Sequence, residues 1–214
     1  MDSKYKSKIN SEYDSFARNY AVANFNSPLQ YQILEFCSLL DSLGFKRSKD
    51  NLILDAGCGP GRDVDSLLAE GFSALGIDFS ESMINIAKEL VPAGDFRIGD
   101  FEESNEFEPE SFCGIWSSAS LIHYPKEEVR AILKNFSYWL KPNGALFISL
   151  LESSDNYEEK ELRIKRFYQN PLKTYFFAIN EMLELLESEG FDIWKYRKDF
   201  DFDNNWIDVF AFKK

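Results

Sequence analysis

Residues 52–61 read Leu-Ile-Leu-Asp-Ala-Gly-Cys-Gly-Pro-Gly, an apolar run that ends in an acidic residue and a glycine-rich turn. An apolar run of this kind is typical of a buried strand in a parallel sheet. Glycine lets the backbone turn sharply and approach a ligand closely, because it has no side chain and tolerates positive φ. A helix is expected to follow over 63–69. The unit is therefore strand, turn and helix, which places a ligand beyond the carboxyl end of the strand.

Two nucleotide-binding patterns do not fit this turn. The dinucleotide fingerprint G-x-G-x-x-G, taken from Gly57, needs a small residue at position 62, where Arg62 stands. The phosphate-binding loop needs a Gly-Lys-Ser/Thr sequence, which does not follow. The turn is instead an acidic residue followed by G-x-G-x-G. The residues that come later in the chain decide between a ligand site and a plain structural turn.

Further apolar runs also end in acidic or polar residues, at similar spacing. Asp78 closes a second expected strand 23 residues after Asp55, and Asp100 closes a third 22 residues after Asp78. Ser80 is a good N-cap for the helix expected after Asp78. A fourth and a fifth strand are expected at 112–116 and 145–151. Ordered strand ends of this kind predict a doubly wound α/β fold with its ligand at the carboxyl edge of the sheet.

These motifs resemble the class I, Rossmann-like S-adenosylmethionine-dependent methyltransferases, in their small stand-alone bacterial form. The resemblance covers about residues 50–152. It implies S-adenosyl-L-methionine as cofactor and S-adenosyl-L-homocysteine as product. It also implies a mostly parallel, doubly wound seven-stranded sheet with a terminal antiparallel hairpin and an N-terminal helical cap. The chain is then one domain, with a cap (1–50), a cofactor-binding core (51–152) and a substrate-side segment with the terminal strands (153–214).

The resemblance implies a set of cofactor contacts at the strand ends. The glycine loop holds the methionine end, Asp78 accepts hydrogen bonds from the ribose hydroxyls, and Asp100 faces the adenine amino group. Phe79 either packs on the adenine ring or belongs to the core. The expected cofactor-binding residues are Asp55, Gly57, Gly59, Gly61, Asp78, Phe79, Asp100, Phe101, Ser117 and Tyr20.

The only histidine, His123, follows the fourth expected strand, where substrate-side residues of the resembled family lie. As a base or an acceptor contact it would help to methylate a hydroxyl or an amine. The alternative is a hydrogen-bonded structural histidine. A general base is optional, because methyl transfer is an in-line displacement that depends largely on positioning. The expected substrate residues are Tyr13, Tyr124, Arg163, Arg166 and Tyr168.

Composition bears on partners and location. The formal net charge of −12 disfavours nucleic acid as a partner, since nucleic-acid binders usually carry a basic patch. There is no apolar run long enough to span a bilayer and no apolar signal core at the amino terminus, so we expect a cytoplasmic protein, monomeric or homodimeric. Three cysteines without zinc spacing and a single histidine indicate that no metal is bound.

The leading functional hypothesis is a metal-independent S-adenosylmethionine-dependent methyltransferase that acts on a small-molecule acceptor by in-line transfer. One alternative is an RNA (tRNA) methyltransferase, since some wobble-uridine enzymes share the Tyr-Asp-rich start seen at 13–20. The acidity of the chain argues against it. The other alternative is a non-catalytic S-adenosylmethionine-binding module. The intact acidic strand ends at positions 55, 78 and 100 argue against that.

Overall fold

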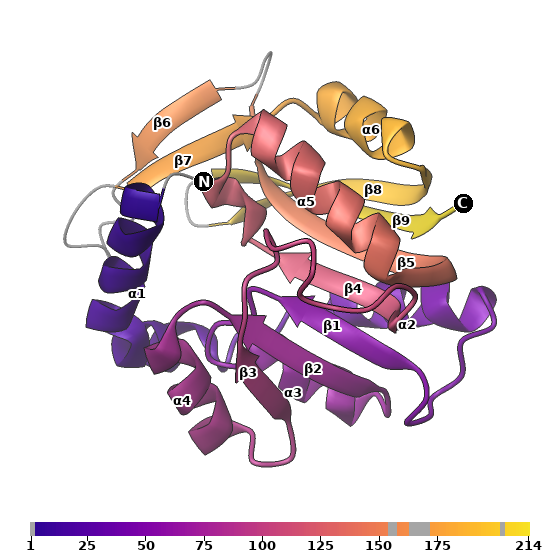
Figure 1. Cartoon of the computed structure of the whole chain (residues 1–214), viewed down its shortest axis with the longest axis horizontal. Coiled ribbons are helices and arrows are strands. Elements are labelled where there is room, and N and C mark those ends of the chain that lie inside the picture. The colour runs from indigo at the N-terminus through magenta and orange to yellow at the C-terminus, as the bar shows by residue number, and fades with distance from the viewer. Residues whose placement is uncertain (1–2, 154–157, 163–171, 202–203) are drawn as a thin grey trace.

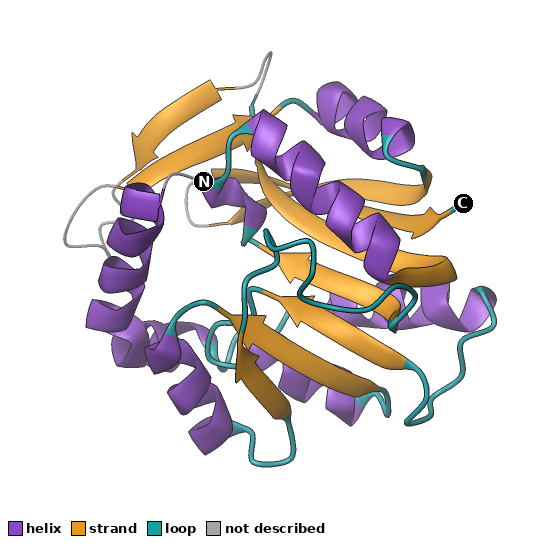
Figure 2. Ribbon diagram, viewed as in Figure 1, coloured by secondary structure: helices purple, strands orange, loops and turns teal. Residues whose placement is uncertain are grey.

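The structure, a computed structural model, describes residues 3–153, 158–162, 172–201 and 204–214. In these residues a nine-stranded sheet carries helices on both faces (Figures 1 and 2). The strands are β1 (Leu52–Ala56), β2 (Ser73–Asp78), β3 (Asp95–Ile98), β4 (Phe112–Ser118), β5 (Leu140–Glu152), β6 (Glu158–Leu162), β7 (Leu172–Phe177), β8 (Phe191–Asp201) and β9 (Asn204–Lys213). The strand order is β3-β2-β1-β4-β5-β7-β6, with β9 paired to β5 and β8 paired to β9.

The first five strands confirm the doubly wound parallel core. β1 pairs in parallel with β2 and β4, β2 pairs with β3, and β4 pairs with β5. The chain builds outward from β1 to β3, then returns to the other side of β1 with β4. Between β1 and β4 the strand order therefore reverses, and ligands of open α/β sheets bind at such a switch point.

The other four strands show where the expectation of seven strands was too low. β8 and β9 form the predicted terminal antiparallel hairpin. β6 and β7 form a second hairpin, which joins the sheet because β7 pairs in parallel with the end of β5. Residues 158–162 read Glu-Glu-Lys-Glu-Leu, which has no apolar alternation. The strand β6 thus depends on its pairing with β7, which a periodicity argument does not detect.

Six helices and one 3₁₀ turn occur in the described part of the chain, and those expected after β1 and β2 are present. They are α1 (Ser3–Asn24), α2 (Gln30–Ser42), α3 (Arg62–Ala69), α4 (Glu81–Leu90), α5 (Lys126–Trp139) and α6 (Ile179–Ser188), with a 3₁₀ turn η1 (Leu121–His123). Ser80 caps α4 as expected, since its Oγ accepts a hydrogen bond from the Met83 N–H at 3.2 Å.

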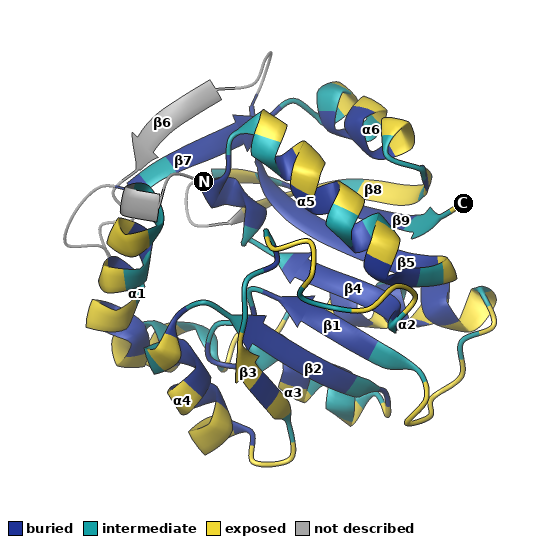
Figure 3. Ribbon diagram, in the orientation of Figure 1, coloured by how far each residue is buried: buried dark blue, intermediate teal, exposed yellow. Residues whose placement is uncertain are grey.

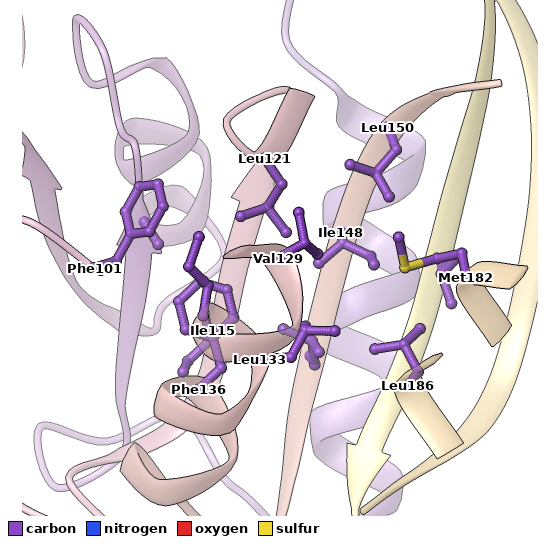
Figure 4. Packing of buried hydrophobic residues seen from close by; sticks show 14 of the residues in the cluster. Phe101, Ile115, Leu121, Val129, Leu133, Phe136, Ile148, Leu150, Met182 and Leu186 are labelled. Carbon is purple, nitrogen blue, oxygen red and sulfur yellow. The ribbon is translucent and has the colours of Figure 1, made fainter. Parts of the chain in front are cut away.

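Two apolar layers hold the sheet between the helices, and the central strands β1, β4 and β5 are largely buried (Figure 3). One layer contains residues of α2, α3 and α4. Within it the ring of Trp116 in β4 stacks on that of Phe147 in β5, with the ring centroids 3.8 Å apart. In the other, α5 and α6 pack against the middle strands (Figure 4). Burial on both faces explains why the core strands read as nearly continuous apolar runs.

The segment expected as a cap, residues 1–50, divides into two parts with different roles. Phe36 and Leu40 of α2 are fully buried in the layer under the sheet, so α2 is a core helix. α1 instead lies beside α4, away from the central strands (Figure 1), where Ala17 and Ala21 pack with Met83. Among the described residues, every helix is too short or too polar to cross a membrane.

Candidate functional site

A cleft opens at the carboxyl edge of the sheet, between α1, the glycine loop and the segment after β4. It encloses about 550 Å³, counted together with its open mouth. The lining residues are Ile9, Tyr13, Tyr20, Gly57, Gly59, Asp78, Phe79, Met83, Phe101, Ser118, Ala119, Ser120, His123 and Tyr124. Most of the expected site residues within the described part of the chain therefore line one cleft.

The glycine loop is tied to the end of β2. Gly57 has a φ of 85°, and a Cβ built there would lie 2.5 Å from Cβ of Ser120, so a side chain would collide with the segment after β4. The N–H groups of Gly57 and Cys58 both donate to the carbonyl of Ile77 at 2.9 Å. The loop thus holds a fixed position relative to β2.

Asp78 lies at the end of β2 and joins the loop to α4. Its carboxylate accepts the N–H of Gly59 at 3.0 Å and the N–H of Ser80 at 2.9 Å. Burial raises the pKa of Asp78 to about 6, and the backbone N–H groups of Ser80, Gly59 and Phe79 oppose that increase. A carboxylate offers about four acceptor positions, so acceptor capacity is left for a hydroxyl group of a ligand.

Asp55 is buried at the end of β1, with an exposed fraction of 1%. Its Oδ2 has no hydrogen-bond partner among the described residues. Burial, together with the charges of Asp63 and Asp78, raises the pKa of Asp55 well above its usual range. A buried acceptor without a partner is costly, so this oxygen of Asp55 is a candidate to accept a hydrogen bond from a ligand.

One functional cluster was missed by the sequence argument. Asp63, in the first turn of α3, accepts two hydrogen bonds from Arg62, at 2.7 and 2.9 Å, and one from Nε1 of Trp116 at 2.9 Å. These bonds attach the start of α3 to β4 and so hold the end of the glycine loop. The sequence did contain a signal for this cluster. Arg62, which breaks the dinucleotide pattern, is followed directly by Asp63 at the start of an expected helix.

Asp100 lies beside the cleft and is not among its lining residues. Its carboxylate forms an ion pair with Lys6 of α1, which also contacts Glu102 at 2.6 Å. The neighbouring Phe101 does line the cleft. Phe79 also lines it and packs against the apolar face of α1, so both interpretations of Phe79 stay open. An adenine contact by Asp100 stays a prediction.

The end of the cleft opposite the glycine loop is formed by α1 and the residues after β4. The Tyr13 hydroxyl lies 2.8 Å from Nε2 of His123. Burial lowers the pKa of His123 to about 4, and the backbone of Lys173 opposes this shift by less. His123 is therefore neutral at physiological pH. Tyr124 is buried in the same wall, and its hydroxyl has no partner among the described residues.

The remaining candidates occupy different places. Tyr20 lines the cleft next to Gly59. Ser117 is fully buried behind the lining, with its hydroxyl 2.5 Å from that of Ser120. Gly61, with φ 87°, precedes α3 and packs against Phe96, so its role is in the turn. Arg163, Arg166 and Tyr168 lie outside the described residues. Within the described ranges, no group of three or more His, Cys, Asp or Glu side chains could hold a metal ion.

Known proteins share this architecture. A family model described as a methyltransferase domain matches residues 53–144, from β1 into β5. The 1,6-didemethyltoxoflavin N1-methyltransferase of Burkholderia thailandensis, solved with its substrate and S-adenosylhomocysteine, superposes with a TM-score of 0.76 at 19% identity, covering 100% of this chain and 91% of that one. Over its core strands the chain is similar to methyltransferase domains, and it shares the fold of the class I S-adenosylmethionine-dependent enzymes.

Sequence relatives in this family act on different substrates. Mouse 18S rRNA (guanine-N(7))-methyltransferase is 28% identical over 110 residues, which is 51% of this chain and 37% of that protein. The ubiquinone biosynthesis O-methyltransferase of Dechloromonas aromatica is 29% identical over 131 residues, or 59% of this chain and 48% of that protein. The chain thus spans less than half the length of either relative. The matched domain and the Burkholderia structure are those of methyltransferases, and the relatives named here differ in their acceptors.

Proposed function

We propose that this chain transfers a methyl group from S-adenosylmethionine to a small-molecule acceptor, without a metal ion. One observation carries the proposal. A single cleft is lined by the glycine loop and Asp78 at one end and by Tyr13 and His123 at the other. A cofactor held by the first pair of elements would present its reactive end toward the second pair.

The residues present suit this cofactor. Asp78 keeps acceptor capacity for the hydroxyls of a ribose. Gly59 leaves the loop backbone open to the cleft, since a Cβ there would meet only Tyr20, at 3.9 Å. Asp55 retains a buried acceptor beneath the loop, suited to the amino group of a methionine moiety. When bound, the cofactor supplies an electrophilic methyl group on a sulfonium.

The protein itself contributes positioning and shelter from water. The strand ends and the loop are joined by backbone hydrogen bonds, so the cofactor end of the cleft is preorganised. α1 covers the acceptor end, where Ile9, Phe16 and Leu172 form a buried apolar cluster. This apolar wall lowers the local dielectric, which strengthens the polar interactions beside it.

Two features favour a small molecule over RNA. The net charge of −12 repels a phosphate backbone. The Burkholderia structure contains a small-molecule substrate, and its likeness covers this whole chain. The rRNA relative, which matches about half of the chain, supports RNA as the second candidate. A cytoplasmic location, and a monomeric or homodimeric state, stay our expectations from composition.

Calorimetry and a methyl-transfer screen test the proposal together. We expect S-adenosylhomocysteine to bind in the micromolar range, about −8 kcal/mol, and NAD not to bind. The screen offers labelled S-adenosylmethionine with small hydroxyl compounds, small amines, tRNA and rRNA. Label in a small molecule supports the proposal. Label in RNA alone would show that the chain is an RNA methyltransferase, the second candidate. Binding of NAD without binding of S-adenosylhomocysteine would refute both methyltransferase candidates.

A further inference from the structure

The acceptor end of the cleft contains a hydrogen-bonded pair built from two distant parts of the chain. Tyr13 comes from α1 and His123 from η1, 110 positions later. Their rings meet edge to face, with centroids 5.7 Å apart and an interplanar angle of 80°. Both side chains line the cleft. A ligand at this end would therefore meet the pair directly.

The direction of the hydrogen bond follows from the surroundings. His123 is 5% exposed, and its Nδ1 has no hydrogen-bond partner of good geometry among the described residues. Burial keeps the ring neutral, with a pKa of about 4. The backbone of Lys173 acts on His123 as a carbonyl acceptor and favours a proton on Nδ1, so Nε2 is the acceptor and the Tyr13 hydroxyl donates to it. The Tyr13 oxygen then keeps lone pairs that can accept a proton from the cleft.

We propose that the methyl acceptor is a hydroxyl compound, whose proton passes to Oη of Tyr13 while the Tyr13 proton passes to Nε2 of His123. This inference rests on the proposed function. The acceptor oxygen forms a bond to the methyl carbon, the carbon–sulfur bond breaks, and its electron pair stays on sulfur. The products are a methyl ether, a neutral thioether and an imidazolium. Tyr13 is then a catalytic residue, and His123 acts through it as a positioning residue.

The weak basicity of His123 distinguishes a hydroxyl from an amine. A hydroxyl that is being methylated becomes an oxonium, a far stronger acid than imidazolium, so even a weak base receives its proton. A methylated amine is an ammonium, a weaker acid than imidazolium, and its proton would not move to His123. The cluster around Tyr13, formed by Ile9, Phe16 and Leu172, is also apolar and suits an uncharged acceptor.

The single histidine makes nuclear magnetic resonance a direct test. In the full chain labelled with ¹⁵N-histidine and loaded with S-adenosylhomocysteine, all imidazole signals come from His123. Phenol serves as the hydroxyl probe, anisole as the same ring without the proton, and benzylamine as the amine probe. We expect phenol to shift the Nε2 signal, and anisole and benzylamine to leave it unchanged. In Tyr13→Phe, the ¹⁵N chemical shift of Nε2 should move to the value of a nitrogen without a hydrogen bond, and it should no longer change when phenol is added.

Tyr31→Phe is the control, because Tyr31 is 75% exposed on α2 and does not line the cleft. It should keep the Nε2 hydrogen bond and the phenol response. In the methyl-transfer screen, Tyr13→Phe should lower transfer to hydroxyl compounds about 10²-fold or more. An Nε2 signal unaffected by Tyr13→Phe, no response to phenol in the parent chain, or a response to benzylamine instead would overturn the inference. If S-adenosylhomocysteine does not bind at all, the proposed function fails first.

Discussion

Asp78 shows how burial and hydrogen bonding compete at one carboxyl group. Its pKa of about 6 means that the carboxylate ionises just below neutral pH, and the ionised form is the better acceptor for ribose hydroxyls. We expect the affinity for S-adenosylhomocysteine to fall as the pH drops from 7.5 to 5, by about tenfold, since one pH unit below the pKa leaves about a tenth ionised. Calorimetry at several pH values measures this.

The matched variant for that experiment is Asp78→Asn, which keeps the size of the side chain. It should bind S-adenosylhomocysteine at least tenfold more weakly at pH 7.5, because two charge-assisted hydrogen bonds are lost. Its affinity should also be nearly independent of pH between 5 and 7.5. An affinity equal to that of the parent chain would show that Asp78 does not contact S-adenosylhomocysteine.

Gly57 tests the steric argument for the loop. In Gly57→Ala the new Cβ would lie 2.5 Å from Cβ of Ser120, on a backbone with φ of 85°. Gly44→Ala is the control, because Gly44 has φ of 91° and nothing within 4 Å of the same position. We expect about 1–2 kcal/mol of destabilisation in the control from backbone strain alone, and clearly more in Gly57→Ala. Equal losses in urea unfolding would show that Ser120 moves aside freely.

At the scale of elements, α1 is attached to the rest of the protein by polar contacts of Lys6, Asp14 and Arg18 and by apolar packing between them. Lys6 bridges Asp100 and Glu102, with side chains 23%, 21% and 15% exposed. In Lys6→Met we expect amides of α1 to exchange hydrogen about five- to thirtyfold faster, which corresponds to about 1–2 kcal/mol. An ion pair that is partly shielded from solvent contributes more to stability than a fully exposed pair, which is why we expect an effect of this size for Lys6.

Arg18→Met is the control on the same helix. Arg18 pairs with Glu89 at 3.2 Å, but the two side chains are 75% and 57% exposed. An exposed pair contributes little, so the exchange of α1 should stay close to that of the parent chain. If both variants loosen α1 equally, the attachment of the helix depends on its net charge and not on the Lys6 contacts.

At the scale of the whole molecule, cofactor binding and folding stability are linked. The cleft draws its lining from α1, the glycine loop, the end of β2 and the segment after β4, so a ligand in it bridges elements far apart in sequence. At 100 times its dissociation constant, S-adenosylhomocysteine should add about 2.7 kcal/mol to the free energy of unfolding. For a chain of 214 residues this raises the Tm by about 5–10 °C. Thermal unfolding with NAD in its place should show no shift.

The sequence by itself determined the parallel core and the cofactor end of the cleft. Strand, turn and helix signals are local, because a buried strand must be apolar and a sharp turn favours glycine. Asp55, Asp78 and the loop glycines could therefore be located from spacing alone. Ser80 was likewise identified as a helix cap, since a cap forms its hydrogen bond within the next turn.

The tertiary structure alone decided the contacts between distant segments. Nothing local in the sequence indicates that Trp116 donates to Asp63, that Lys6 binds Asp100, or that Tyr13 meets His123. The β6–β7 hairpin is of the same kind, because its strands are held by pairing and not by their own apolar pattern. Such contacts form when packing brings together parts of the chain whose patterns are independent. The acceptor end of the cleft consists largely of them, while the cofactor end follows from motifs confined to short stretches.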